Sequence, residues 1–311
     1  MQLRAALNSA IDRLAAQQVP SPRMNGELLL MFTLDCDRAY LYAHPERELT
    51  SDELSRFDAV LARRATGVPA QYITGHQEFW GMDFIVSPAV LIPRPETEHV
   101  VEAVLELVSR SDSGQEQEQS QRQPAGAPAL HELRIVDVGT GSGAIALALA
   151  KELPAAEIYA TDISEAALEV ARANAARHEL SSRIGFHHTD LLSGLPLESF
   201  DFVISNPPYI GESEKESVQL EVRKFEPHNA VFAGPTGLEV IERLIPQAHA
   251  ALAPGGVRED LAREALRQLF HELCKQHHRP ASALPLCART NSTAAPTVRI
   301  WAACSSLMLT P

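Results

Sequence analysis

The apolar residues of the first 66 positions recur at helical spacing. In the first predicted helix they lie three or four positions apart, on one face: Leu3, Leu7, Ile11 and Leu14. A second apolar stretch follows at residues 28–32. Thr50 and Glu53 then stand at the spacing of a capping box, which opens a third helix. We therefore expect a small helical bundle over residues 1–68 and assign it no chemistry beyond docking a substrate.

Residues 69–95 differ in character from the helical region. They place aromatic and β-branched residues between glycines and prolines, a composition typical of a β-hairpin, and we expect this hairpin to link two domains. Residues 93–98 then open a helix, because a proline and carboxylates in the first turn suit a helix N-terminus. Residues 111–130 consist mainly of Ser, Gln, Glu, Gly, Pro and Ala, which predicts a low-complexity loop.

From residue 133 the pattern alternates between short buried strands and helices. Strands are predicted at residues 133–138, 157–161, 183–188 and 200–205, and helices at residues 144–153 and 164–178. Such alternation is typical of a parallel α/β sheet wound on both faces, and we expect one domain of this class over residues 96–256. Ligands of such sheets bind beyond the carboxyl ends of the strands.

A glycine-rich turn lies between the first predicted strand and its helix: Asp137-Val138-Gly139-Thr140-Gly141-Ser142-Gly143. Its glycines let the backbone turn sharply and approach a ligand closely, and the helix N-terminus offers free N–H groups. Asp162, at the end of the next strand, can accept hydrogen bonds from both ribose hydroxyls of an adenosine. The spacing is G-x-G-x-G rather than the G-x-G-x-x-G of dinucleotide enzymes, so the turn predicts a nucleoside cofactor.

A second motif follows the last predicted strand: Asn206-Pro207-Pro208-Tyr209. The two prolines fix an extended backbone and remove two donors, which leaves main-chain carbonyls free to accept hydrogen bonds. The carbonyl of the Asn206 side chain is a further acceptor. Two fixed acceptors would hold an NH2 group and direct its nitrogen at a methyl donor, while Tyr209 offers a flat face to a planar amide or base.

The nitrogen of a planar amide is a poor nucleophile, because its lone pair is delocalised into the carbonyl. Hydrogen bonds from the NH2 group to Asn206 Oδ1 and to the Pro207 carbonyl would favour the positive charge that develops on nitrogen. Asn206, Pro207 and Tyr209 are therefore the candidate catalytic residues. The reaction needs no metal and no general base, because the methylated cation is acidic enough to lose its proton to water.

Asp190 and Leu191 follow the strand at residues 183–188. Their position in the fold predicts that they line an adenine pocket, where the Asp190 carboxylate could accept from the adenine amino group. A surface aspartate is the alternative, because a lone Asp carries no motif.

The composition of the 311 residues narrows the classes of function. Apolar and charged contents of 45% and 22% are those of an ordinary globular protein. A net charge of −13 disfavours nucleic acid as a stable partner. No apolar run reaches the ~18–20 residues of a membrane span, so we expect a cytoplasmic protein that does not bind membranes. We also expect a monomer. The four cysteines show no metal-site spacing: Cys36, Cys274, Cys287 and Cys304.

Several segments in combination resemble the release factor glutamine methyltransferase family. They are Gln71-Tyr72-Ile73, Phe79, Leu91–Glu98, Asp137–Gly143 and Asn206–Ile210. The resemblance covers residues 1–256. The Asn-Pro-Pro-Tyr motif alone is shared with DNA methyltransferases that act on adenine or cytosine amino groups. Residues 92–98 separate the family from its sister that acts on a ribosomal protein.

This resemblance implies a Rossmann-like class I methyltransferase sheet, S-adenosylmethionine as the cofactor, and the glutamine of the Gly-Gly-Gln loop of peptide chain release factors as the substrate. The implied cofactor-binding positions are Gly139, Thr140, Gly141, Ser142, Gly143, Asp162, Leu191 and Asn206. The implied substrate-binding positions are Asn206, Pro207, Pro208 and Tyr209. Two other functions stay open: a methyltransferase acting on DNA or other amino groups, and a cofactor-binding protein that no longer catalyses.

Two segments depart from the family pattern. Met-Asn-Gly at residues 24–26 replaces a usual Asp-Ala pair, which is a minor change within the helical region. Residues 257–311 do not align with the family: a charged helix and a Ser/Thr/Ala/Pro-rich stretch replace the expected last strands. A sheet without those strands would leave an edge exposed, at a cost to stability and activity.

Overall fold

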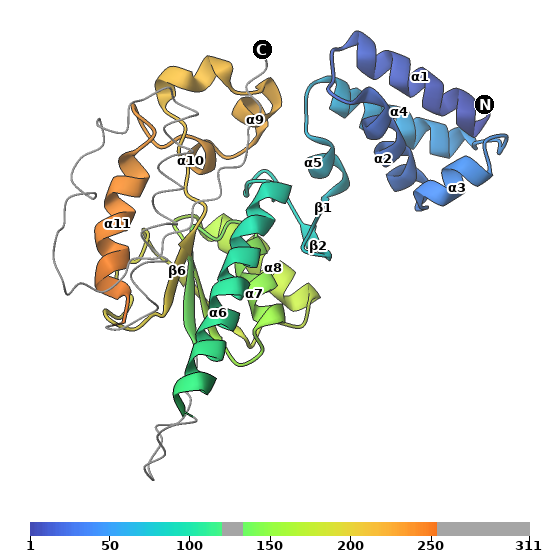
Figure 1. Cartoon of the computed structure of the whole chain (residues 1–311). Coiled ribbons are helices and arrows are strands. Elements are labelled where there is room, and N and C mark those ends of the chain that lie inside the picture. Colours follow the sequence, from blue (N-terminus) through green and yellow to red (C-terminus); the bar gives the residue numbers. More distant parts are fainter. Residues whose placement is uncertain (120–132, 254–311) are drawn as a thin grey trace.

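The computed structural model describes residues 1–119 and 133–253 (Figure 1). A helical bundle stands at one end of the molecule, a parallel sheet with its helices forms the larger part, and a short hairpin lies between them. The predicted tail at residues 257–311, its three cysteines and residues 120–130 of the predicted loop lie outside the described residues.

The bundle contains α1 (Leu3–Ala16), α2 (Pro22–Leu34), α3 (Arg38–Ala43) and α4 (Ser51–Ala65). The predicted apolar faces of α1 and α4 form its core, with Leu3, Leu14, Phe57 and Leu61 all buried. The predicted capping box is present, since Thr50 Oγ1 accepts from the Glu53 N–H and Glu53 Oε2 accepts from the Thr50 N–H. Phe32 is 46% exposed and does not belong to this core.

The linker differs from the prediction at its start. Residues 70–74 form a short helix, α5 (Ala70–Thr74), rather than part of a hairpin, and Gly75 ends it with a φ of +80° that glycine adopts without strain. The hairpin itself is shorter than expected, with β1 (His76–Phe79) paired to antiparallel β2 (Met82–Ile85).

The next helix is longer than predicted. A 3-10 turn, η1 (Pro95–Thr97), leads into α6 (Glu98–Gln119), which continues into the segment expected to be a loop. Glutamate and glutamine have good helix propensity, so a low-complexity stretch rich in them can extend a helix.

The predicted strands and helices of the second domain are confirmed within a few residues at each end. They are β3 (Arg134–Val138), α7 (Ala144–Glu152), β4 (Glu157–Asp162), α8 (Glu165–Arg177), β5 (Ile184–His188) and β6 (Phe202–Ser205). Ser164 caps α8 by accepting from the Ala167 N–H at 3.2 Å. In the described part of the chain the sheet is parallel with strand order β5-β4-β3-β6.

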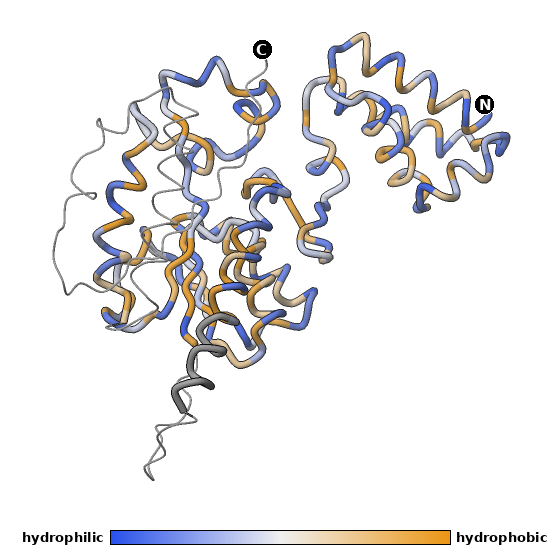
Figure 2. Tube along the Cα trace, in the orientation of Figure 1, coloured by the Kyte–Doolittle hydropathy of each residue, from blue (hydrophilic) through white to orange (hydrophobic). Residues whose placement is uncertain are grey.

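Helices cover both faces of the sheet, as the pattern predicts. On one face Ile135, Phe202 and Ile204 pack with α6 and with α7, whose residues 144–150 are all buried. On the other, Val136 and Val203 pack with α11 (Glu239–Ala251). Figure 2 shows the corresponding concentration of hydrophobic positions along β6 and its neighbouring strands. The fold is therefore a doubly wound α/β sheet.

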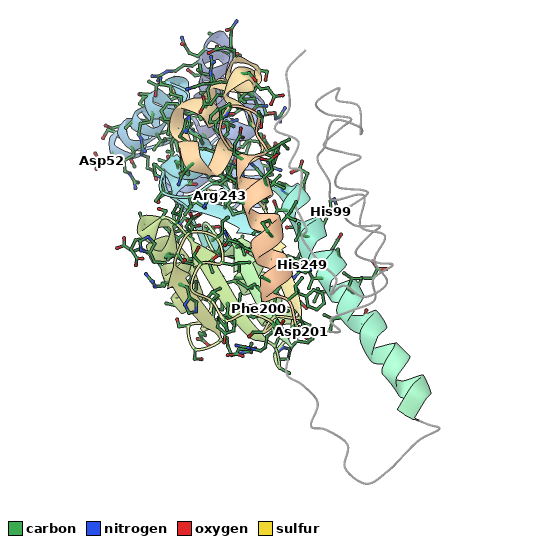
Figure 3. The ribbon with its side chains drawn as sticks, turned by 90° about the vertical axis from the view of Figure 1, so that its left-hand side faces the viewer. Asp52, His99, Phe200, Asp201, Arg243 and His249 are labelled. Carbon is green, nitrogen blue, oxygen red and sulfur yellow. The ribbon has the colours of Figure 1, made fainter. Side chains whose placement is uncertain are left out.

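Three short elements connect β6 to α11: η2 (Glu212–Ser217), α9 (Leu220–Phe225) and α10 (His228–Val231). Figure 3 places Phe200 and Asp201, which precede β6, near His249 in the C-terminal half of α11, with Arg243 farther along the same helix. None of the helices in residues 1–119 and 133–253 is long and apolar enough to cross a membrane.

Candidate active site

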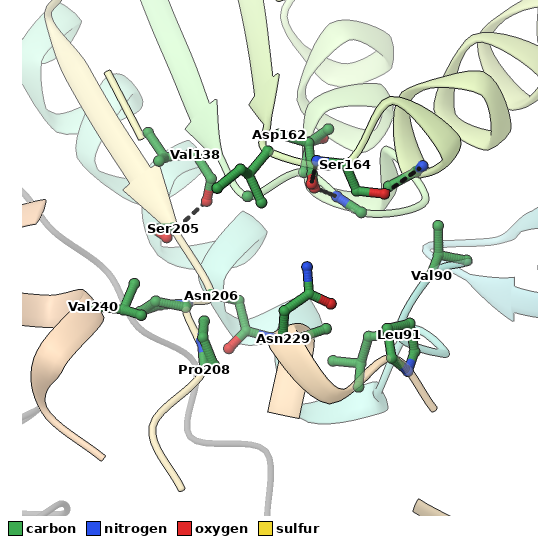
Figure 4. A pocket seen from close by; sticks show the side chains of 18 of the residues that line it. Val90, Leu91, Val138, Asp162, Ser164, Ser205, Asn206, Pro208, Asn229 and Val240 are labelled. Carbon is green, nitrogen blue, oxygen red and sulfur yellow. Dashed lines mark hydrogen bonds between the residues drawn. The ribbon is translucent and has the colours of Figure 1, made fainter. Parts of the chain in front are cut away.

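A pocket of about 290 Å³ opens at the carboxyl ends of the strands (Figure 4). Four of its sides follow strands, as predicted: residues 138–142, 162–164, 190–191 and 205–208. The predicted glycine-rich turn and the predicted Asn-Pro-Pro motif therefore line one pocket, although they follow different strands and lie far apart in the sequence.

The glycine-rich turn is tied to the end of β4. The N–H groups of Gly139 and Thr140 both donate to the Thr161 carbonyl, at 2.8 and 2.9 Å. Gly139 and Gly141 have φ values of +73° and +56°, and a Cβ added to either would meet no atom within 4 Å. Their backbone thus borders open pocket space, which fits a loop that contacts a ligand directly.

Gly143, unlike Gly139 and Gly141, packs against other residues of the protein. It does not line the pocket, and its φ is +85°. A Cβ there would lie 2.7 Å from Leu147 Cδ1 and 3.3 Å from the Cβ of Ala171. Gly143 therefore allows α7 to start close to α8.

Asp162 lines the pocket at the end of β4. Its Oδ2 accepts from the Gly141 N–H and its Oδ1 from the Ser164 N–H, both at 2.9 Å. Burial raises the pKa of this carboxyl above its ordinary value, and the two backbone hydrogen bonds oppose that rise. Each carboxylate oxygen keeps a second lone pair, so Asp162 can still accept from the hydroxyls of a ribose.

Ile163, the residue after Asp162, also lines the pocket and is 57% exposed. The sequence does not mark Ile163 as a site residue, because an isoleucine at the end of a strand is expected to lie in the core. An exposed apolar side chain here can cover one face of an adenine ring.

Asp137, the first residue of the glycine-rich turn, is buried below the pocket. Its Oδ2 accepts from the Thr140 hydroxyl at 2.6 Å, which fixes the turn from the inside. Burial raises the pKa of the Asp137 carboxyl to about 7, and the hydrogen bond from Thr140 works against that rise.

Replacing Asp137 by asparagine should therefore remove one part of the pH dependence of stability. The carboxyl has a pKa of 3.8 in an unperturbed state and about 7 in the fold. Between these values the folded protein holds a proton that the unfolded chain has lost, so the stabilisation is complete below about pH 4 and is lost as the pH rises through 7. The slope approaches about 1.4 kcal/mol per pH unit.

Urea unfolding of both proteins between pH 4.5 and pH 8 would check this. The free energy of unfolding of the wild type, minus that of Asp137→Asn, should fall across this range. A difference independent of pH would show that Asp137 titrates normally.

The segment after β6 is held from two sides. The Ser205 hydroxyl donates to the Val138 carbonyl at 2.7 Å, which joins the segment to β3. Asn206 Nδ2 donates to Thr97 Oγ1 at 3.4 Å, so the NH2 side of this amide turns toward the linker and Oδ1 turns away from it. Pro207 and Pro208 line the pocket directly.

Tyr209 lies beside the main pocket rather than in its wall. It lines a smaller adjoining hollow together with Asn206, Pro207 and Pro208, and it packs against a cluster that contains Ile210 and Phe232. The four residues of the predicted motif thus meet at the junction of the two hollows.

Gly237 holds the backbone of this motif in place. Its φ is +82°, and a Cβ there would lie 2.4 Å from the Tyr209 carbonyl oxygen and 2.8 Å from the Gly211 nitrogen. Gly237→Ala should displace the Tyr209–Gly211 backbone and lower kcat/KM of the reaction in this pocket by about 10²-fold, the cost of a 1 Å misplacement.

Gly194→Ala is the matched control, because Gly194 has a φ of +80° and no atom within 4 Å of an added Cβ. Steady-state kinetics of the two variants would separate the clash from the strain of a positive φ. Equal effects would remove the clash with Tyr209 from the account.

Asp190 and Leu191 both line the pocket, as predicted. Asp190 forms an ion pair with Arg243 of α11, a partner that the sequence did not indicate. Leu191 has a positive φ of +55°, an uncommon conformation for a leucine. The pair between Asp190 and Arg243 connects this edge of the pocket to α11.

Two further segments complete the walls of the pocket, and the sequence predicted a place in the pocket for neither. One is residues 89–94 of the linker together with Thr97 of η1, and the other is residues 227–233 around α10. In Figure 4 the Asn229 side chain projects into the pocket between Asn206 and Leu91. Contacts between segments so far apart in the chain leave no periodic signal in the sequence.

Asn174 of α8 supports the glycine-rich turn from behind. This fully buried side chain donates to the Ser142 carbonyl at 2.9 Å and to the Ile85 carbonyl at 3.0 Å, and it accepts from the Ile85 N–H at 2.7 Å. It joins the turn to the hairpin.

Family models match both parts of the chain. The PrmC N-terminal domain matches residues 5–75, and the methyltransferase small domain matches residues 126–224. The fold and the pocket are those of a methyltransferase, and its cofactor is S-adenosylmethionine.

Three of the similar curated proteins carry the name release factor glutamine methyltransferase. That of Koribacter versatilis is 54% identical over 257 residues, covering 82% of this chain and 84% of that protein. That of Moorella thermoacetica is 44% identical, covering 83% and 84%, and that of Chlorobaculum tepidum is 42% identical, covering 81% and 82%. The chain belongs to the release factor glutamine methyltransferase family.

Proposed function

We propose that the protein transfers a methyl group from S-adenosylmethionine to the side-chain amide nitrogen of the glutamine in the Gly-Gly-Gln motif of peptide chain release factors. The observation that carries this proposal is that the glycine-rich turn and the Asn206–Pro208 segment line the same pocket. The name of the relatives supports glutamine over other planar NH2 groups.

Residues 139–142, Asp162, Leu191 and Asn206 would hold the cofactor. The open space above Gly139 and Gly141 fits a ligand that rests on the backbone, and the lone pairs left on Asp162 fit ribose hydroxyls. When bound, S-adenosylmethionine supplies an electrophilic methyl group. The Asn-Pro-Pro segment across the pocket would present the acceptor nitrogen to it.

The acceptor amide would be held by its two N–H bonds. Asn206 Oδ1 and the Pro207 carbonyl accept these bonds, which favours the positive charge that grows on nitrogen. Thr97 fixes the orientation of the Asn206 amide that this role needs. Tyr209 would pack against the plane of the glutamine amide. The nitrogen gains the methyl group and releases one proton to water.

Four further features belong to the same proposal. The bundle of residues 1–68 would dock the release factor, with residues 69–95 as its link to a catalytic domain at residues 96–256. The net charge of −13 disfavours stable binding of nucleic acid. The protein would act as a monomer. Action on release factors would place the protein in the cytoplasm.

Transfer of label from methyl-labelled cofactor would test the substrate. The purified protein would be offered a release factor, the same factor with its Gly-Gly-Gln glutamine changed to alanine, and duplex DNA. We expect label in the first substrate alone. Equal label in both release factors would rule out the proposed glutamine, label in DNA would support an amino-group DNA methyltransferase, and cofactor binding without transfer would indicate an inactive protein.

A further inference from the structure

Two walls of the pocket that are distant in sequence are joined by one buried carboxylate. Arg94 belongs to the linker wall, and Glu226 immediately precedes the wall formed by residues 227–233. Glu226 Oε1 pairs with the Arg94 guanidinium, and its Oε2 accepts from the Ile92 N–H at 3.3 Å. One side chain thus makes two contacts with the opposite wall.

The ion pair between Glu226 and Arg94 is buried, which restricts the relative positions of the two walls. The Glu226 side chain is 1% exposed and that of Arg94 is 20% exposed. A buried carboxylate is costly unless it is paired and hydrogen-bonded, so the two walls must stay together for the charge to be compensated. Arg94 also lines both hollows, beside Asn206 and Pro207.

Both walls have further anchors. The Tyr72 hydroxyl donates to the Val90 carbonyl at 2.6 Å, which fixes the start of the linker wall. On the other side, Arg64 of α4 pairs with Glu221 of α9 at 2.8 Å and also donates to Asn25 Oδ1 at 2.7 Å. Glu226 is therefore the link between two segments that are each attached to the N-terminal part of the chain.

We propose that Glu226 is a positioning residue for methyl transfer: through Arg94 and Ile92 it sets the separation of the two walls that hold the substrate amide against Asn206. Glu226 lines neither hollow. This inference rests on the proposed function. It predicts that breaking the pair harms the alignment of the acceptor without harming the cofactor end of the pocket.

Glu226→Gln tests this, because it keeps the shape of the side chain and removes its charge. We expect kcat/KM for the release factor to fall by about 10–10²-fold, from misalignment at the reacting atoms, while the dissociation constant of S-adenosylmethionine changes less than threefold. The double variant Arg94→Met/Glu226→Gln should lose no more than the worse single variant, since the two residues act as one unit.

Glu157→Gln is the matched control. It breaks the ion pair of Glu157 with Arg134, whose distance is 2.9 Å, at the amino end of β4, outside the pocket and outside the bundle. It should lower the melting temperature without changing kcat/KM by more than twofold. If it lowers kcat/KM as much as Glu226→Gln does, the effect is one of stability and the proposal fails.

Hydrogen exchange provides a measurement that needs no substrate. Backbone exchange at residues 89–97 and 226–233 should rise in Glu226→Gln and stay unchanged in Glu157→Gln. Unchanged exchange in these two segments would overturn the proposal even if activity fell. A wild-type protein that leaves release factors unmethylated would refute the proposed substrate, and the exchange result would still decide whether Glu226 holds the walls together.

Discussion

Asn206→Ala should lower the turnover of methyl transfer by about 10²–10³-fold, the usual cost of removing one hydrogen-bond partner of a transition state. Asn206 sits at the junction of the two hollows, and Thr97 orients its amide. The loss should appear in kcat, with little change in cofactor affinity, because we propose that the glycine-rich turn and Asp162 make most of the contacts with the cofactor.

Single-turnover kinetics with saturating cofactor would measure this effect. Glu169→Ala is the control, since Glu169 is an exposed residue of α8 outside the pocket and outside the bundle. A loss of less than threefold in Asn206→Ala would remove this residue from the mechanism.

Asp162→Ala should weaken binding of S-adenosylmethionine by about 10²-fold. The variant loses the acceptor proposed for the ribose, and each hydrogen bond to a charged group contributes about 1.5–3 kcal/mol. It also releases the Gly141 N–H, which Asp162 holds at 2.9 Å, so the turn loses part of its support.

Calorimetric titration of the cofactor would show the change directly. Asp52→Ala provides the comparison, because Asp52 is an exposed carboxylate at the start of α4 and does not line the pocket. Unchanged affinity in Asp162→Ala would mean that the ribose lies elsewhere.

The sequence predicts the parallel sheet well because its signals are local. The strands at β3 and β6 are short apolar runs buried on both faces, and Ser164 announces α8 by its capping position. Parallel strands end at one edge, so the positions of the glycine-rich turn, Asp162 and Asn206 in one pocket follow from the strand order alone.

Local signals also explain the errors. Residues 70–74 carry the aromatic and β-branched residues of a strand, yet they form α5, because Gly75 ends a helix as readily as it starts a turn. Gly143 belongs to a ligand-binding motif by its spacing, and its neighbours in space, Leu147 and Ala171, give it a packing role that the spacing did not indicate. Neither distinction is visible without tertiary contacts.

The residues that complete the pocket were beyond the sequence pattern for the same reason. Arg94 and Glu226 are joined across 132 positions of the chain, and Asp190 and Arg243 across 53. Periodicity records which face of an element is buried and carries no information on which charged residue it will meet. Ile163 is exposed although it is apolar, and Asn174 is buried although it is polar. The hydrophobic pattern predicts the reverse for both, so it marks neither as part of the site.

The central claim is that the pocket transfers a methyl group to a glutamine side chain. Tandem mass spectrometry of a release factor incubated with the protein and S-adenosylmethionine tests it most directly. The account predicts a single added methyl group on the amide nitrogen of the Gly-Gly-Gln glutamine, and none when Asn206→Ala replaces the wild type for the same short time. A methyl group on any other residue, or on the Gly-Gly-Gln glutamine at an equal rate with Asn206→Ala, would contradict it.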